Sequence, residues 1–233
     1  MNLQQVGNHT LRSDGQPASA VQRNRVLRNT YWLLALSMVP TVMGAWIGVA
    51  SGISRAMTPG LGLVVFLAGA FGFMFAIEKT KNSAAGVPIL LGFTFFMGLM
   101  LSRLVGTVLG LGNGASLVMT AFAGTGAIFL GMASLSSIIK RDLTAMGKWL
   151  FVGMVMLLVA GIANFFIQSS ALMITLSVLA IGIFSAFILH DLKRVQDGLE
   201  TNYISATLGV YLSIYNVFQS LLMLLGIMGG RDE

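Results

Sequence analysis

The sequence predicts an all-α membrane protein with seven transmembrane helices. Hydrophobic residues make up 56% of the 233-residue chain and charged residues only 9%, with a mean hydropathy of +0.85. Soluble domains carry about 25% charged residues, and one of this size could not bury so much apolar surface. Long apolar stretches and an uneven distribution of cations also indicate a membrane protein, so the lipid bilayer is the first expected partner.

A polar arm, residues 1–30, precedes the first apolar stretch. It has too few apolar residues to pack, and its cations are Arg12, Arg23, Arg25 and Arg28. The apolar stretch that follows is too long for the core of a cleavable signal peptide, so we expect it to be retained. The sequence therefore predicts a flexible N-terminal arm ahead of the membrane domain.

Seven stretches approach the roughly 20 apolar residues that a spanning helix needs. They cover residues 31–52, 61–78, 87–109, 115–139, 148–168, 171–190 and 206–228. Turn residues such as Thr58-Pro59-Gly60 separate them, and Pro40 predicts a kink in the first. Only residues 168–170 divide the fifth stretch from the sixth, where one unbroken long helix is the alternative. We predict a membrane domain over 31–228 and a short tail over 229–233.

The Lys and Arg residues indicate the orientation. Eleven lie in the arm and in the breaks 78–86, 140–148 and 190–205. Three lie on the opposite side of a seven-span arrangement, at Arg55, Arg103 and Arg231. Because cationic loops are retained in the cytoplasm, this bias predicts a cytoplasmic N-terminus and an external C-terminal tail.

Small residues recur at four-residue spacing in the first span, at Gly44, Gly48 and Gly52. This spacing is typical of helices that pack closely in membranes. We expect it to serve packing within the chain or loop flexibility, with a dimer interface as the alternative.

Asp191 is the acidic residue with the strongest functional interest. It follows the apolar run 181–189 and sits beside His190, near the inner end of the sixth span. One interpretation is an interfacial acid paired with Lys193 or Arg194. The other is a proton-responsive carboxylate that faces the interior of the bundle, since ionisable groups are costly in a membrane.

The last span is the most polar. Ser213, Asn216 and Ser220 repeat at i, i+3 and i+7 and share one helical face, and Tyr211 and Tyr215 form a neighbouring stripe with Gln219. In lipid such groups must find partners, so this face should point into the protein. The pattern suits a seventh helix that is central and surrounded by the other six.

Asn164 and Gln168, four residues apart on the fifth span, are candidate partners for this polar face or pore-lining groups. Ordinary structural hydrogen bonding is the alternative. We group Asn164, Gln168, Tyr211, Tyr215, Asn216 and Ser220 as a predicted interior polar network.

No enzyme is expected. The chain has no HExxH motif and no cysteine, and its two histidines, His9 and His190, cannot build a His-rich metal site. Gly114-Ala115-Ser116 is similar to the nucleophile motif of intramembrane serine proteases, but His190 would lie across roughly 30 Å of hydrocarbon. We therefore predict no catalytic residue, no metal, no cofactor and no nucleic-acid partner.

Two segments resemble a known family. The segment 26–34, Val-Leu-Arg-Asn-Thr-Tyr-Trp-Leu-Leu, resembles the entry into the first helix of the YccA-like bacterial branch of the Bax inhibitor-1 (TMBIM) family. The segments 200–207 and 211–218 are similar to that branch's signature at its last helix. The resemblance implies a bacterial inner-membrane protein of seven helices, with the last helix enclosed by the other six. The external C-terminal tail predicted from the charge bias then lies in the periplasm.

The resemblance also implies two functions. Some family members are pH-sensitive calcium leak channels controlled by two aspartates, and Asp191 matches the first while Ser213 stands at the second. Without a second carboxylate the two positions cannot share a proton, and a calcium site would lose an anionic ligand.

The bacterial branch is instead associated with the membrane AAA protease FtsH, as a substrate and modulator. A free N-terminal arm is a plausible handle for such a protease. The leading prediction is a non-enzymatic protein that binds and modulates FtsH in membrane-protein quality control. The alternative is a pH-sensitive leak for calcium, other cations or protons, with Asp191 and Ser213 at the gate.

Overall fold

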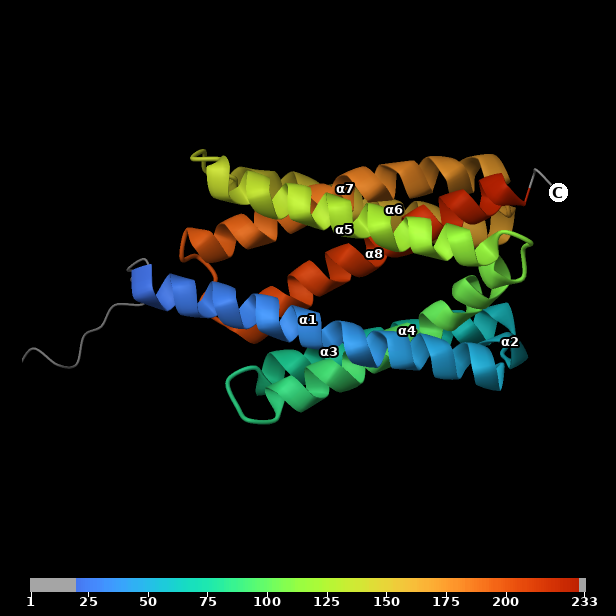
Figure 1. Ribbon diagram of the computed structural model, residues 1–233, viewed down its shortest axis with the longest axis horizontal. Helices are drawn as coiled ribbons and strands as arrows, with labels where there is room; N and C mark the ends of the chain where they lie inside the picture. The colour runs from blue at the N-terminus through green and yellow to red at the C-terminus, as the bar shows by residue number, and fades with distance from the viewer. Residues whose placement is uncertain (1–19, 231–233) are drawn as a thin grey trace, which may run out of the picture.

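The computed structural model describes residues 20–230, apart from the side chains of Ser54 and Arg55. Residues 1–19 of the predicted arm and 231–233 of the predicted tail lie outside this range. The described chain forms eight helices (Figure 1), namely α1 Ala20–Ser51, α2 Ile53–Ala56, α3 Pro59–Thr80, α4 Gly86–Leu109, α5 Gly114–Ile138, α6 Thr144–Ile167, α7 Ser170–Gln196 and α8 Tyr203–Gly229. All except α2 are long and apolar enough to cross a membrane, which confirms the prediction of seven long apolar helices.

The first helix starts earlier than its apolar stretch predicts. α1 begins at Ala20, so the last part of the predicted flexible arm is helical. Val26 is buried in a small apolar cluster with Val195 of α7 and Ala206 of α8. Arg25 stays exposed on the same segment. The helical extension is therefore stabilised by a narrow apolar face. The average hydropathy of this mostly polar stretch does not reveal that face.

A well-formed turn separates α6 from α7. Gln168 takes a left-handed conformation, with a φ of 54°, and its backbone N–H donates to the carbonyl of Asn164 over 2.8 Å. The side-chain oxygen of Asn164 accepts from the backbone N–H of Ser169 over 3.1 Å. Ser169 in turn caps α7 by accepting from the N–H of Leu172. The fifth and sixth predicted spans are thus two helices rather than one.

Glycines bring α1 and α4 into backbone contact. A Cβ at Gly44 would collide with the carbonyl oxygen of Phe95, and one at Gly98 would collide with that of Thr41. Gly52 is different, because it has a φ of 67° and a Cβ there would meet nothing. The first glycine of the predicted series therefore serves packing within the chain, while the last serves the turn that ends α1.

Four chain segments gather at one end of the bundle in Figure 1. They are the start of α1, the α3–α4 turn, the α5–α6 loop and the α7–α8 loop. We call this the cation-rich end, because it holds Arg23, Arg25, Arg28, Lys79, Lys81, Lys140, Arg141, Lys148, Lys193 and Arg194. The segments predicted to share one membrane face therefore do lie together.

The last helix makes wide contacts. α8 packs against α1, α3, α4, α5 and α7, and it runs obliquely through Figure 1. The main apolar core joins it to α1 and α4 through Leu34, Phe93, Val210 and Tyr211. α6 packs mainly on α7, which in turn packs on α8.

Candidate functional site

Asp191 and His190 form a pair near the cation-rich end of α7. The Nδ1 atom of His190 lies 3.1 Å from Oδ1 of Asp191, and their side chains are 9% and 19% exposed. A Cβ at Gly147 of α6 would lie 2.6 Å from Nε2 of His190. A Cβ at Gly209 of α8 would lie 2.9 Å from Oδ2 of Asp191. The pair therefore bridges α6 and α8, and the glycines leave the space that it occupies.

The neighbouring cations do not pair with Asp191. Lys193 instead binds the carboxylate of Asp197 over 2.6 Å, one turn further along the chain. The interfacial interpretation named Lys193 or Arg194 as the partner, whereas the observed partner is the imidazole of His190. Asp191 therefore contacts His190 and takes no part in the ion pair between Lys193 and Asp197.

Ser213 lies near Asp191 without a direct bond to it. Its hydroxyl donates to the carbonyl of Gly209 over 3.0 Å, and Gly209 is the residue against which the carboxylate of Asp191 packs. Among the described residues, no three His, Cys, Asp or Glu side chains gather to hold a metal ion. The gating role predicted for Asp191 and Ser213 stays a prediction.

The two tyrosines of α8 face α1 and α4. The hydroxyl of Tyr211 lies 2.9 Å from that of Thr41 and 3.4 Å from the carbonyl oxygen of Thr94. The hydroxyl of Tyr215 donates to the carbonyl of Met97 over 3.3 Å. These contacts give both buried hydroxyls a partner on a neighbouring helix, as lipid requires.

Three further polar residues of α8 face a different neighbour. Asn216, Gln219 and Ser220 line an open cavity of about 220 Å³ between α6, α7 and α8. Asn164 and Gln168 contribute to the turn between α6 and α7 and form no hydrogen bond to α8 in the described chain. The residues grouped as one polar network are therefore distributed over three places.

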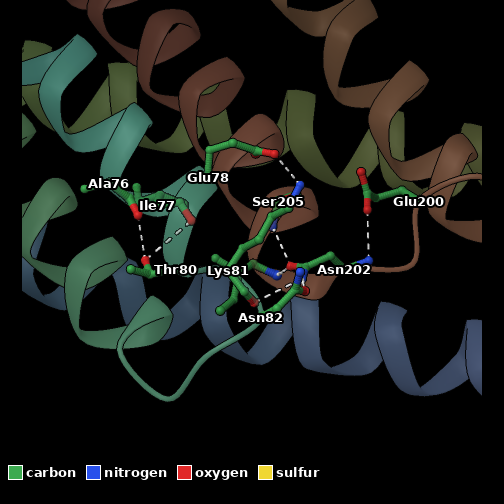
Figure 2. A network of polar contacts seen from close by, with 10 residues as sticks. Ala76, Ile77, Glu78, Thr80, Lys81, Asn82, Glu200, Asn202 and Ser205 are labelled. Atoms are coloured by element: carbon green, nitrogen blue, oxygen red, sulfur yellow. Dashed lines mark hydrogen bonds and ion pairs between the residues drawn. The ribbon is translucent and has the colours of Figure 1, made fainter.

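Asn202, which is not among the predicted site residues, joins two loops at the cation-rich end (Figure 2). Its side-chain oxygen accepts from the backbone N–H groups of Ile204 and Ser205 over 2.9 and 3.1 Å, which caps α8. Its Nδ2 donates to the carbonyl of Lys81 over 3.0 Å and to Oδ1 of Asn82 over 2.8 Å. An asparagine just before an apolar run is a recognisable cap signal, but its tie to the α3–α4 turn has no local signal.

Glutamates flank this connection on both sides, Glu200 in the loop before α8 and Glu78 near the end of α3. Oε1 of Glu200 accepts from the backbone N–H of Asn202 over 2.8 Å. On the other loop, Nζ of Lys81 lies 2.5 Å from Oε1 of Glu78 (Figure 2). The segment that carries the family resemblance at residues 200–207 thus sets how α8 begins.

A second connection at this end involves Gln196, the last residue of α7. Its carbonyl accepts from Nη1 of Arg23 over 3.1 Å, and its side-chain amide donates to the hydroxyls of Ser136 and Ser137 over 2.9 and 3.2 Å. The C-terminus of a helix favours a cation, so Arg23 suits this position. Gln196 therefore ties α1 and α5 to the end of α7.

The loop before α6 holds a local contact. Oδ1 of Asp142 accepts from the hydroxyl of Thr144 over 2.6 Å and from its backbone N–H over 2.8 Å. These two hydrogen bonds hold the pKa of the Asp142 carboxyl below its ordinary value, since they favour the charged form. This carboxylate lies outside the membrane-spanning segments and stabilises the start of α6.

Comparisons with known proteins give a consistent result. A family model described as "Inhibitor of apoptosis-promoting Bax1" matches residues 23–230. A protein of Escherichia coli K12 named "Modulator of FtsH protease YccA" is 36% identical, covering 92% of this chain and 94% of its own length. The version from E. coli O6:H1, named "Inner membrane protein YccA", gives the same values. An "Uncharacterized membrane protein" of Vibrio cholerae is 37% identical, over 91% and 93% of the two chains.

Proposed function

Since this chain belongs to the Bax inhibitor-1 family as a YccA-like multi-pass inner-membrane protein, we propose that it binds and modulates a membrane AAA protease of the FtsH type. The observation that carries the proposal is the relative named as a modulator of that protease, which matches this chain over 92% of its length. Modulation by binding needs no catalytic centre in the chain. It needs a contact surface and a segment that the protease can engage.

We place the cation-rich end in the cytoplasm, where it would face the protease. The cations of four segments support this orientation, because they are brought together at one end of the bundle. The residues before Ala20 would then emerge on the cytoplasmic side and serve as the handle. We also propose that α8 is the central helix, which its packing against five others supports.

Co-purification from bacterial membranes tests the binding. We expect the full-length chain to retain an FtsH-type protease, and raised levels of the chain to slow the turnover of a membrane substrate of that protease. A variant in which a Gly-Ser segment of equal length replaces residues 1–19 should be degraded more slowly while still folding. Absence of the protease from the purified chain, together with unchanged substrate turnover, would reject the proposal.

A cation leak is the second candidate, and one contact favours it. The carboxylate of Asp191 lies against the α8 backbone at Gly209, so a change at this carboxylate would alter how α7 and α8 pack. Proteoliposomes test this directly through calcium flux at pH 6 and pH 8. A leak gated at this site predicts a flux that changes with pH and becomes independent of pH in Asp191→Asn. Equal fluxes for both proteins at both pH values exclude it.

A further inference from the structure

The cavity between α6, α7 and α8 holds polar groups that the protein itself does not satisfy. The amide of Gln219 and the hydroxyl of Ser220 line it, and neither forms a hydrogen bond within residues 20–230. Asn216 lines it as well, with its Nδ2 donating to the carbonyl of Leu212 over 2.7 Å. In hydrocarbon an unsatisfied amide or hydroxyl is costly, so these groups need a partner from outside the chain.

The polar residue Gln219 lies near the middle of its membrane helix. It is ten residues before the end of α8 at Gly229, which places it roughly 15 Å from that end of the helix. Half of a bilayer's hydrocarbon core is also about 15 Å thick. α6 packs mainly on α7, so the open cavity lies in the gap between α6 and α8, and it extends from Gln219 towards Met173, one turn into α7 from Ser170.

The walls are apolar and adaptable. Met154, Met173 and Met223 line the cavity from three different helices. Methionine side chains are flexible and polarisable, and they suit surfaces that accept ligands of varied shape. The wall therefore fits an apolar partner that carries one hydrogen-bonding group.

A second, larger cavity shows what a simple lipid groove looks like in this protein. It measures about 670 Å³ between α1, α4, α5 and α8, and its lining is almost entirely apolar. The hydroxyls of Tyr211 and Tyr215, which line it, are already hydrogen-bonded to α1 or α4. Lipid tails would fill that larger cavity at no cost in hydrogen bonds. In the cavity between α6, α7 and α8 they would leave Gln219 and Ser220 without hydrogen-bond partners.

We propose that the cavity between α6, α7 and α8 binds a polar side chain presented by a transmembrane helix of another membrane protein. A volume of about 220 Å³ admits a side chain and not a helix, so the partner helix would lie along the gap between α6 and α8. Asn, Gln and Ser side chains form hydrogen bonds between membrane helices, so a helix that has not yet assembled with its neighbours leaves such side chains without these partners. The link to quality control rests on the proposed function, but the binding does not.

The chain contains no cysteine, which makes a direct binding test possible. Val159, next to Leu158 on α6, is 59% exposed and does not line the cavity, so Val159→Cys offers a site for a fluorescent label that leaves the cavity free. The labelled protein is reconstituted in vesicles with a Leu-rich model helix that carries one central Asn and an acceptor dye. The same helix with Leu in place of Asn is the control, because it lacks the hydrogen-bonding side chain. We expect about three- to tenfold tighter binding of the Asn helix, the range for polar contacts between membrane helices.

Variants of the protein identify the site. Gln219→Leu combined with Ser220→Ala should remove the preference for Asn. Gly161→Leu should also remove it, because Gly161 lines the cavity and a Cβ there meets open space. Gly131→Leu on α5 is the control, since its Cβ also meets open space and it does not line the cavity.

Two results would overturn the inference. The first is equal affinity for the Asn and Leu helices, which would mean that lipid or water fills the cavity. The second is a preference that persists in both cavity variants, which would locate the contact elsewhere. Because the assay contains no protease, its failure is independent of the failure of the proposed function. A melting curve for each variant shows that it is folded.

Discussion

α4 and α6 are both 24-residue apolar helices, yet the protein buries them to very different extents. Of the most apolar stretch of α4, 44% is buried, against 6% of that of α6. The difference arises from what their side chains meet. α4 uses Gly98 to contact α1 and Phe93 to fill the core under α8, whereas Leu150 and Asn164 are the buried residues of α6. Hydropathy alone therefore does not distinguish a core helix from a lipid-facing one.

The comparison separates a tied half of the molecule from an open half. The tied half is α1, α4 and α8 with the α3–α4 turn, joined by glycine contacts, buried hydroxyls and the Asn202 cap. The open half is α6 with the cavity that it shares with α7 and α8. Stability should depend on the tied half, and partner binding on the open half.

The largest expected effect is at the contact between α1 and α4. Gly98→Ala forces a Cβ into the carbonyl of Thr41, and we expect it to lower the free energy of unfolding by about 2–3 kcal/mol. Gly161→Ala makes the same change in α6, where a Cβ meets open space, and should raise stability by up to about 1 kcal/mol through helix propensity. Unfolding in detergent micelles measures both. Equal effects of the two substitutions on the free energy of unfolding would contradict the distinction between the tied half and the open half.

The next effect is at Asn202. Asn202→Ala removes the cap of α8 and the donor to the α3–α4 turn, so we expect a loss of about 1–2 kcal/mol. Asn202→Asp keeps an oxygen for the N–H groups of Ile204 and Ser205 but cannot donate to Lys81. It should therefore fall between wild type and Asn202→Ala, with faster amide exchange confined to residues 81–85. An Asp variant as unstable as the Ala variant would show that the cap contributes nothing.

A smaller effect is expected where α1 meets the end of α7. Arg23→Ala removes the donor to the Gln196 carbonyl and the cation at this helix terminus, at a cost of about 1 kcal/mol. Arg25→Ala, two residues away and exposed, is the control and should stay within about 0.5 kcal/mol of wild type. If both variants match wild type, the contact contributes no stability, and the apolar cluster around Val26 holds the start of α1.

The sequence predicts the spans well because the bilayer fixes their length. It misses the early start of α1, since Val26 is buried by Val195 and Ala206, which come from distant parts of the chain. The break at Gln168, where one long helix was the alternative, depends on a left-handed residue and on the cap at Ser169. Local signals place these turns, but contacts between distant residues set the helix ends.

Prediction of the candidate site from the sequence has a similar limit. Helical spacing places Ser213, Asn216 and Ser220 on one face of α8, and it does not say which neighbour each side chain meets. In the structure Asn216 and Ser220 reach the cavity beside α6, while Tyr211 meets Thr41 on α1. Periodicity along one helix carries no information on the order of the helices around it. For the same reason the tie from Asn202 to Lys81 was not predictable.

The smallest effect concerns the start of α6, where the open half is held by a local contact. The pKa of Asp142 is lowered by its hydrogen bonds to Thr144, so its contribution is complete above the ordinary value of 3.8. It is lost as the pH falls through the lowered pKa, when protonation weakens both bonds. The protection factor of the Thr144 amide, which compares its exchange with the intrinsic rate at the same pH, should fall in wild type between pH 5 and pH 3. Asp142→Asn should show no such fall, because Asn does not titrate. The same curve for both proteins would show that the start of α6 does not depend on this carboxylate.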